Sequence, residues 1–170
     1  GFRSPSFESI ATFRRHQVYF SDQKEGNQWV LEQFRIKTFF QIVLLEKLAK
    51  RRRKQADELK ELANGINASL DKMPHTQQAP DSTWAGRVMG WEGAIAKKYW
   101  SAIALVLEGP WAFSGRTRRP AQDPFNATIN YLYAFLYSLV EQALFHAGLD
   151  PHLGILHADE YDRPTLAYDL

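Results

Sequence analysis

Three short segments of the 170-residue sequence carry side chains that could bind a divalent cation. The first is Gly90-Trp91-Glu92-Gly93, in which the Glu92 carboxylate lies beside an apolar helical pattern. The second is Gly154-Ile155-Leu156-His157, and the third is Thr165-Leu166-Ala167-Tyr168-Asp169. Two carboxylates and one imidazole suit Mn²⁺ or Mg²⁺ and disfavour soft metals. Because the chain has no cysteine, thiolate metal sites, disulfides and cysteine nucleophiles are excluded.

Each of these residues also has a simpler interpretation that the sequence leaves open. Glu92 could be an ordinary acid in the first turn of a helix, where the helix dipole favours negative charge. His157 could be a partly buried side chain that is hydrogen-bonded to the backbone. Asp169 could complement the dipole of a short helix that Thr165 caps. The remaining acids of this region are typical of a solvated turn: Asp159, Glu160 and Asp162.

Basic side chains gather in two places that could contact the phosphates of a nucleic acid. Lys50-Arg51-Arg52-Arg53-Lys54 would span about 500° of a helix, so these side chains cannot all face one side. A solvated face is therefore as good an interpretation as phosphate binding. Glycine and proline bound the loop Gly115-Arg116-Thr117-Arg118-Arg119-Pro120, and arginine suits bidentate phosphate contacts. We therefore predict phosphate binding by this loop, through Arg116, Arg118 and Arg119.

The charge of the chain is distributed unevenly. The net charge is +2, but residues 1–119 contain 20 basic and 12 acidic residues, whereas residues 120–170 contain one basic and seven acidic residues. The first part suits a polyanion, and the second suits either a solvated tail or a divalent cation. No apolar run approaches the roughly 18 residues of a membrane span. No Ser-His-Asp signature, P-loop or dinucleotide-binding glycine pattern is present.

The elements that would position the first candidate acid and the basic run are predicted to be helices. A long helix begins at about Asn27 and its pattern continues to Leu70, with Gly65 as a weak point or as the helix end. A short helix, which Asp81-Ser82-Thr83 can cap, ends at Met89 because Gly90 interrupts it. A further helix then covers residues 91–107.

The second half of the chain has clear helix start and stop signals. Asp123-Pro124 begins a helix that Gly148 ends, and apolar side chains on all its faces predict that it is buried. A last helix begins at Thr165. Few strand signals and no internal repeat are present, so we predict an all-α domain around the helix after Asp123.

Taken together, four motifs in order resemble the CRISPR-associated integrase of spacer acquisition, the Cas-one family. Residues 90–93, followed by Lys98-Tyr99-Trp100, resemble the family's EG…YF helix. Residues 115–127 resemble its GRxRRPxxDPxNA segment, residues 148–157 its GLDPxxGxLH element, and residues 163–170 its RPSLAxDL element. The resemblance is strong over residues 84–170 and looser over the long helix before them.

This resemblance implies a domain organisation. Members of the family have a small β-rich N-terminal domain and a larger helical C-terminal catalytic domain, and this chain resembles the helical domain alone. Residues 1–26 would be a connector from the missing N-terminal domain. Residues 27–170 would be the catalytic domain, ending before the turn that carries the last metal ligand.

The resemblance also implies an activity. The family inserts protospacer DNA into a CRISPR array by attack of a 3′-hydroxyl on a phosphodiester, and it depends on Mn²⁺ or Mg²⁺. Glu92 and His157 match its metal ligands, and Asp169 matches an acid of the catalytic site. The implied partners are protospacer and repeat DNA, a second copy in a homodimer and the Cas-two adaptation protein, in the prokaryotic cytoplasm and without a membrane.

Two other interpretations compete with this one. If the last metal ligand is missing, the chain could be a non-catalytic helical DNA-binding or assembly fragment. A plain helical scaffold would leave the arginine loop and the histidine segment unexplained.

Overall fold

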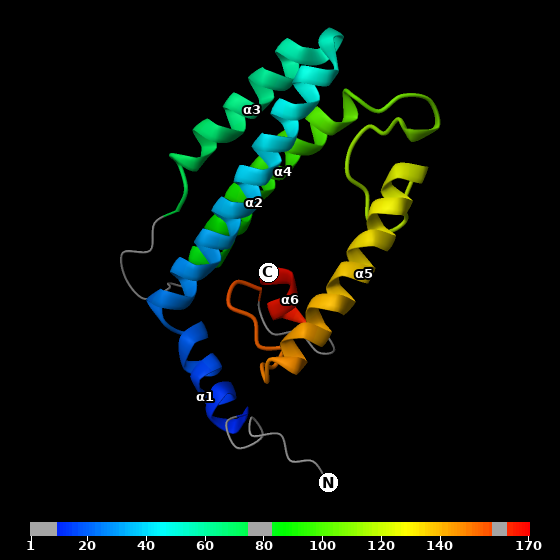
Figure 1. Ribbon diagram of the computed structural model, residues 1–170. Helices are drawn as coiled ribbons and strands as arrows, with labels where there is room; N and C mark the ends of the chain where they lie inside the picture. Colours follow the sequence, from blue (N-terminus) through cyan, green and yellow to red (C-terminus); the bar gives the residue numbers. More distant parts are fainter. Residues whose placement is uncertain (1–9, 75–82, 158–162) are drawn as a thin grey trace. The chain divides into compact units, whose positions relative to one another are not determined.

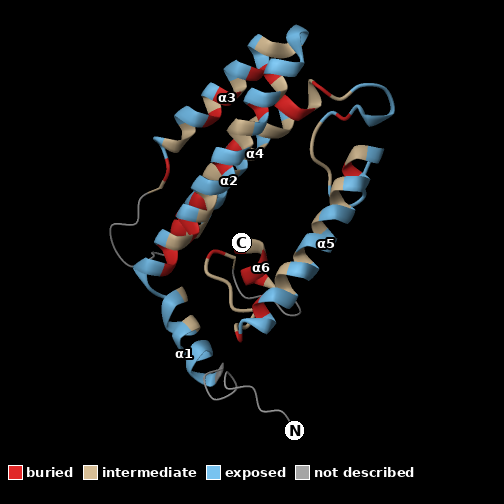
Figure 2. Ribbon diagram, in the orientation of Figure 1, coloured by how far each residue is buried: buried red, intermediate tan, exposed pale blue. Residues whose placement is uncertain are grey.

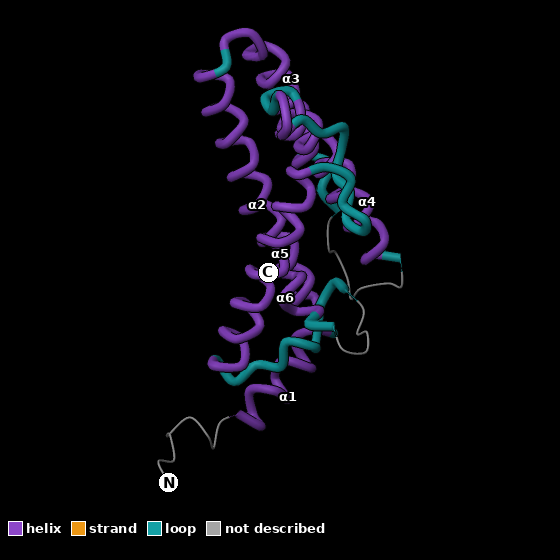
Figure 3. Tube along the Cα trace, turned by 90° about the vertical axis from the view of Figure 1, so that its right-hand side faces the viewer, coloured by secondary structure: helices purple, strands orange, loops and turns teal. Residues whose placement is uncertain are grey.

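A computed structural model of the chain describes residues 10–74, 83–157 and 163–170. These ranges consist of helices and loops without a strand, which confirms the all-α prediction (Figures 1 and 3). The chain divides into two compact units. The first unit comprises Gly1–Gln33, Thr76–Ala85 and Ala134–Leu170, and the second comprises Phe34–His75 and Gly86–Tyr133. Each unit has a hydrophobic core of its own.

The predicted long helix is in fact two helices with a break inside the basic run. Helix α2 (Lys24–Arg51) ends where Arg52 leaves the helical conformation, with φ −111° and ψ 75°. The 3₁₀ turn η2 (Arg53–Gln55) then leads into α3 (Ala56–Leu70), and Gly65 lies inside α3. The break leaves two basic side chains in the last turn of α2, where they complement the helix dipole.

The core of the second unit lies between α2, α3 and α4 (Trp84–Ala104). Figure 1 shows α3 returning alongside α2, and Figure 2 shows buried positions on α2, α3 and α4. Leu59 and Ile66 are fully buried, and burial of each such side chain contributes about 1.5–3 kcal/mol. The buried core residues of the three helices are Leu45, Ala49, Leu59, Ala63, Ile66, Ile95, Ala102 and Ile103.

The prediction that Gly90 interrupts a helix is wrong. Helix α4 runs without a break from Trp84 to Ala104 and includes Gly90. An interior glycine costs a helix only about 1 kcal/mol, and Val88 and Ile95, on either side of it, are buried. Packing therefore outweighs the local propensity, and Glu92 lies in the middle of a helix rather than in its first turn.

The first unit contains α1 (Ile10–Ser21), the start of α2, the end of α5 (Pro124–His146) and α6 (Thr165–Asp169). Its small core joins Leu144 of α5 to Leu166 and Ala167 of α6, with Trp29 of α2 packed against them. Helix α1 lies in the segment that we predicted to be a connector, and its irregular apolar pattern concealed the helix. Residues 1–9 of that segment lie outside the described residues, and its role as a connector stays a prediction.

Helix α5 has its predicted ends but not its predicted burial. The Oδ1 atom of Asp123 accepts the backbone N–H of Asn126 at 2.7 Å, which is an N-cap, and Gly148 has the positive φ of 81° that suits a glycine after a helix. Only Asn126 and Leu144 of α5 are buried, whereas the helix exposes large apolar side chains (Figure 2). These are Tyr131, Leu132, Phe135, Leu136, Leu139 and Phe145. The sequence pattern shows that α5 needs apolar neighbours but not which segment supplies them.

The turn η3 (Gly109–Trp111) follows α4 and begins at the predicted Gly109-Pro110 stop. In the ranges that the structure describes, none of the helices combines the length and the apolar character needed to cross a membrane.

Candidate functional site

Asp169, the last residue of α6, is a buried carboxylate surrounded by hydrogen-bond donors. Its Oδ2 atom accepts the backbone N–H groups of Ile155 at 2.6 Å and of Leu156 at 3.0 Å. Its Oδ1 atom accepts the backbone N–H of His157 at 3.3 Å and lies 2.6 Å from His157 Nδ1. The exposed fraction of the Asp169 side chain is 0%. Asp169 is therefore an internal anchor for residues 155–157, and its interpretation as a first-turn acid is wrong.

His157 is held at one ring nitrogen and is partly open to solvent. Its Nδ1 atom faces Asp169, and 39% of its side chain is exposed. The ring meets Tyr168 edge-on, with 6.0 Å between centroids, and Tyr168 packs in the same manner on Tyr137 of α5. The Nε2 atom makes no hydrogen bond to the described residues. The second ring nitrogen of a metal-binding histidine usually donates to a carboxylate, a backbone carbonyl or water, and here it faces a carboxylate.

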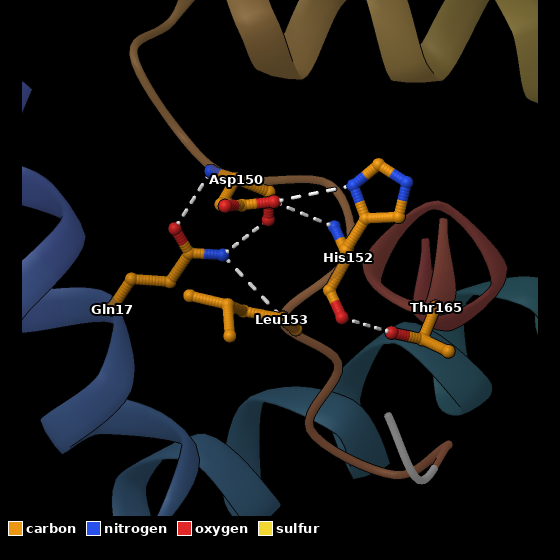
Figure 4. A network of polar contacts seen from close by, with 5 residues as sticks. All are labelled: Gln17, Asp150, His152, Leu153 and Thr165. Atoms are coloured by element: carbon orange, nitrogen blue, oxygen red, sulfur yellow. Dashed lines mark hydrogen bonds and ion pairs between the residues drawn. The ribbon is translucent and has the colours of Figure 1, made fainter. Parts of the chain in front are cut away.

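A second set of polar contacts shapes the loop that leads to the histidine (Figure 4). The side-chain amide of Gln17, from α1, donates to the Asp150 carbonyl at 2.7 Å and accepts the Asp150 N–H at 2.9 Å. Asp150 Oδ1 accepts the N–H of His152 at 3.0 Å, and the Thr165 hydroxyl donates to the His152 carbonyl at 2.7 Å. Pro164 occupies the N-cap position of α6, so the predicted capping role of Thr165 is wrong.

Gly154 gives this loop the room that it needs. A Cβ atom at Gly154 would lie 2.5 Å from the His157 carbonyl oxygen and 2.9 Å from Thr165 Cβ. Both distances are shorter than atoms tolerate, so the turn that carries the histidine can pass α6 only with glycine at this position.

Glu92, on α4, belongs to the other unit and has a basic partner. Its Oε1 atom lies 2.5 Å from Nζ of Lys37 on α2, and 28% of the Glu92 side chain is exposed. The Lys37 Nζ atom also lies 5.3 Å from the centroid of the Phe34 ring. No local sequence pattern predicts this pair, because 55 positions separate its members. His157 and Asp169 thus lie together in the first unit, whereas Glu92 belongs to the second unit.

The chemistry of the two predicted ligands fits a hard divalent cation. Glu92 supplies a carboxylate, and His157 supplies an imidazole whose second nitrogen faces a carboxylate. Within residues 10–74, 83–157 and 163–170, no three His, Asp or Glu side chains form a group that could hold a metal ion. The turn acids, Asp159, Glu160 and Asp162, lie outside the described residues.

The three arginines of the 115–120 loop differ in environment. Arg116 donates from Nη1 to the Thr117 carbonyl at 2.6 Å and to Asn126 Oδ1 at 3.0 Å. Its guanidinium carbon also lies 5.7 Å from the Trp100 ring centroid and 5.6 Å from that of Tyr133. Arg118 and Arg119, in contrast, are exposed. Arg116 is therefore committed to contacts within the chain, and the other two are the better candidates for phosphate contacts.

Trp100 of α4 lies beside Arg116, and Tyr99 lies beside Trp100. Trp100 contacts Phe113 and Phe125 edge-on, and Tyr99 contacts Trp100. Burial raises the pKa of the Tyr99 hydroxyl above its usual 10.0, and Tyr133 raises it further. Both effects disfavour the charged phenolate form of Tyr99.

Asn126 fixes the arginine loop to the start of α5. It is fully buried, and its Oδ1 atom accepts from Arg116 and from the Thr117 N–H, the latter at 2.9 Å. Its Nδ2 atom donates to the Gly115 carbonyl at 2.9 Å and to Asp123 Oδ2 at 2.7 Å. Asn126 was not among the residues predicted from the sequence, although its place three residues after an aspartate cap is a recognisable local signal.

We predict that Asn126→Ala lowers the free energy of unfolding by about 3 kcal/mol, because it leaves buried donors and acceptors without partners. For a chain of this size the melting temperature should fall by about 6–12 °C, measured by circular dichroism. The control is Thr128→Ala, since this exposed hydroxyl donates to the Pro124 carbonyl of its own helix and not to the arginine loop. Equal melting temperatures for the two variants would contradict the anchoring role.

The basic run at the end of α2 is exposed at every position from Lys50 to Lys54. This exposure agrees with a solvated surface and with phosphate binding alike, so both interpretations of the run stay open.

The match to known proteins extends over almost the whole chain. Residues 2–170 match the family described as CRISPR associated protein Cas1. The CRISPR-associated endonuclease Cas1 1 of Archaeoglobus fulgidus is 34% identical over 170 residues, which cover 94% of this chain and 49% of that protein. The CRISPR-associated endonuclease Cas1 of Hyperthermus butylicus is 35% identical over 145 residues, which cover 85% of this chain and 42% of that protein. The chain thus spans about half the length of these curated relatives or slightly less.

Solved structures show the same fold. A chain of the structure entitled "Partial Cas6-RT-Cas1--Cas2 complex" is similar with a TM-score of 0.79 and 22% identity, covering 99% of this chain and 48% of that one. A chain of "Casposase bound to integration product" is similar with a TM-score of 0.73 and 24% identity, covering 96% of this chain and 43% of that one. The half-length matches and the helical fold agree with the predicted C-terminal helical domain. Because the family match includes residues 2–170, the chain belongs to the Cas1 family of CRISPR-associated proteins.

Proposed function

We propose that this chain is the catalytic helical part of a metal-dependent DNA integrase and endonuclease that inserts protospacer DNA into a CRISPR array. The observation that carries the proposal is His157, whose Nδ1 atom is held by a buried carboxylate and whose Nε2 atom is left for a ligand. The names of the relatives support it, since they are called endonucleases. A protein of similar fold was solved as a casposase bound to integration product.

In this proposal Glu92 and His157 hold one Mn²⁺ or Mg²⁺ ion. When bound, the ion would polarise the phosphoryl group and stabilise the negative charge that develops on it. His157 would contribute Nε2 to the ion. Glu92 would contribute a carboxylate oxygen once the ammonium group of Lys37 has left it. The exposed Arg118 and Arg119 would contact backbone phosphates of the DNA.

The reaction exchanges one phosphodiester for another. The 3′-hydroxyl oxygen of the protospacer forms a bond to phosphorus, the bond from phosphorus to the 3′-oxygen of the target strand breaks, and the departing oxygen takes up a proton. One ester bond forms and one breaks, so no energy-rich co-substrate is required. With water as the attacking group, the same site would hydrolyse the strand, which is endonuclease activity.

A strand-transfer assay tests this function directly. The 170-residue chain, and a chimera in which it replaces the matching part of the Archaeoglobus fulgidus relative, would be incubated with 3′-hydroxyl protospacer DNA and a repeat target. We expect joined or nicked products with Mn²⁺, in the chimera at least, and none with EDTA. A chimera that folds and binds the DNA but yields no product with Mn²⁺ or Mg²⁺ would refute the catalytic assignment.

Lys37 should lower the affinity of Glu92 for a cation. Because its ammonium group forms an ion pair with Glu92 Oε1, it competes with the cation for that carboxylate. We predict that Lys37→Met tightens Mn²⁺ binding by about two- to fivefold, which matches the about 0.5–1 kcal/mol of a surface ion pair. Electron paramagnetic resonance titration of free Mn²⁺ measures this change. The matched control is Lys47→Met, an exposed lysine on the same helix, and equal tightening in both variants would show a general charge effect instead.

The second candidate function is a non-catalytic DNA-binding or assembly fragment. The observation that favours it is the exposed apolar surface of α5, which carries a single acidic side chain, Glu141. Such a surface suits a protein partner. A second copy in a homodimer and the Cas2 protein are the proposed partners, and a protein of similar fold was solved in a Cas6-RT-Cas1–Cas2 complex. DNA binding without product in the assay above would support this alternative.

A further inference from the structure

We infer that Asp169 is a positioning residue and not a metal ligand: it fixes the Nδ1–H tautomer of His157 and thereby leaves the Nε2 lone pair for the cation. The tautomer follows from the contacts of these two residues alone. Its consequence for metal binding rests on the proposed function. Asp169 would thus act on the reaction through the histidine, without touching DNA or the metal.

The hydrogen bonds of Asp169 leave its carboxylate no room for a cation. An ionised carboxylate has about four lone-pair sites, and Asp169 meets four donors. Three are the backbone N–H groups of residues 155–157, and the fourth is the imidazole of His157. A metal ion at either oxygen would displace some of these donors inside a region where the Asp169 side chain has no exposed surface. Displaced backbone N–H groups would then lack partners away from water, which is costly.

The same contacts determine which ring nitrogen of His157 carries the proton. The 2.6 Å distance between His157 Nδ1 and Asp169 Oδ1 is that of a strong hydrogen bond to an ionised acceptor. If the neutral ring instead carried its proton on Nε2, the lone pair of Nδ1 would face the lone pairs of the carboxylate at this distance. The Nδ1–H form is therefore favoured, and Nε2 is the acceptor atom that a cation requires.

The rest of the loop is built to keep this geometry. The Thr165 hydroxyl, at the other end of α6, holds the His152 carbonyl, and Gly154 allows the chain to pass close to Thr165. Gln17 of α1 fixes the first residue of the loop, Asp150, through two hydrogen bonds. Figure 4 shows these contacts of Gln17 with Asp150 and of Thr165 with His152, which hold the loop that precedes His157.

The tautomer can be measured in the unaltered chain. We would record ¹⁵N–¹H correlation spectra of the histidine rings at a pH at which His157 is neutral, with His157→Gln to assign its signals. We expect the Nδ1–H form to exceed the Nε2–H form at least tenfold. A dominant Nε2–H form in the unaltered chain would overturn the inference, whatever the chain does with metal or DNA.

The substitution Asp169→Asn tests the consequence. Asparagine has nearly the same shape but only one acceptor oxygen, so it cannot receive all four donors. We expect the preference for the Nδ1–H tautomer to be lost and Mn²⁺ binding, followed by electron paramagnetic resonance, to weaken 10–100-fold, as for other groups that orient a metal-bound histidine. The control is Asp57→Asn, which makes the same substitution at an exposed acid of α3 that contacts neither His157 nor its loop, and we expect it to keep the Mn²⁺ affinity.

The outcomes separate this inference from the proposed function. An unaltered chain that shows the Nδ1–H tautomer but binds no Mn²⁺ would refute the metal site and leave the positioning of His157 intact. An Asp169→Asn chain that keeps both the tautomer and the Mn²⁺ affinity would refute the positioning role alone. If Asp169→Asn fails to fold, amide exchange in the unaltered chain still decides the anchoring. Slow exchange at Ile155 and Leu156 supports it, and fast exchange contradicts it.

Discussion

Replacing His157 with alanine should abolish the Mn²⁺-dependent joining and nicking of DNA, with a loss of at least about 10³-fold. A metal ion contributes several kcal/mol to stabilising the charge of the transition state, and each 1.36 kcal/mol corresponds to a tenfold change in rate. The imidazole is one of the two proposed metal ligands, so without it most of the stabilisation of the transition state by the metal should be lost. Glu92→Ala should have an effect of similar size, because it removes the other ligand. Both effects would be measured as initial rates of strand transfer in the chimera.

Matched substitutions distinguish loss of a ligand from loss of folding. His152→Ala removes a histidine of the same loop, with 41% of its side chain exposed, and Glu61→Ala removes an exposed glutamate of α3. We expect both controls to keep activity within a fewfold of the unaltered protein. Activity that survives Glu92→Ala and His157→Ala together would eliminate the metal-site assignment. Equal losses in the ligand variants and in their controls would point to unfolding.

The residue types of the candidate site could be predicted from the sequence, but their geometry could not. Residue type and motif predict Glu92, His157 and Asp169 as site residues, and the structure adds that Asp169 is an anchor between α6 and the histidine loop. Local patterns could not reveal this role, because the hydrogen bonds join residues 12–14 positions apart across a turn. Gln17 lies further still from its partner, 133 positions before Asp150, and stands in a segment that resembled a connector.

The same division applies to the fold. Helix ends with a local signal were predicted correctly, as at Asp123-Pro124 and Gly148, because a cap and a positive φ depend on the residues nearby. Features that depend on packing between distant segments were not predicted correctly. Gly90 lies inside α4 because buried side chains flank it, and α5 is exposed although its composition is that of a buried helix. Periodicity indicates how apolar a helix is, whereas burial depends on which segments are present to cover it.

Charge reversal in the arginine loop should separate DNA binding from folding. We predict that Arg118→Glu with Arg119→Glu weakens duplex binding at least about tenfold and reduces the magnitude of the salt slope by about 1.8, which corresponds to two phosphate contacts. The melting temperature should change little, because both side chains are exposed. Fluorescence anisotropy at several salt concentrations measures the slope, and differential scanning calorimetry measures the stability.

Arg116→Ala should show the opposite pattern. Its guanidinium group bonds to Thr117 and Asn126 and lies against Trp100, so its loss should lower the free energy of unfolding by about 2–3 kcal/mol. The salt slope should stay close to that of the unaltered chain at temperatures where the variant is folded, because this guanidinium is held within the loop. If Arg116→Ala flattens the slope without loss of stability, the phosphate contact belongs to Arg116. If the double reversal leaves binding unchanged, the loop lies outside the path of the DNA.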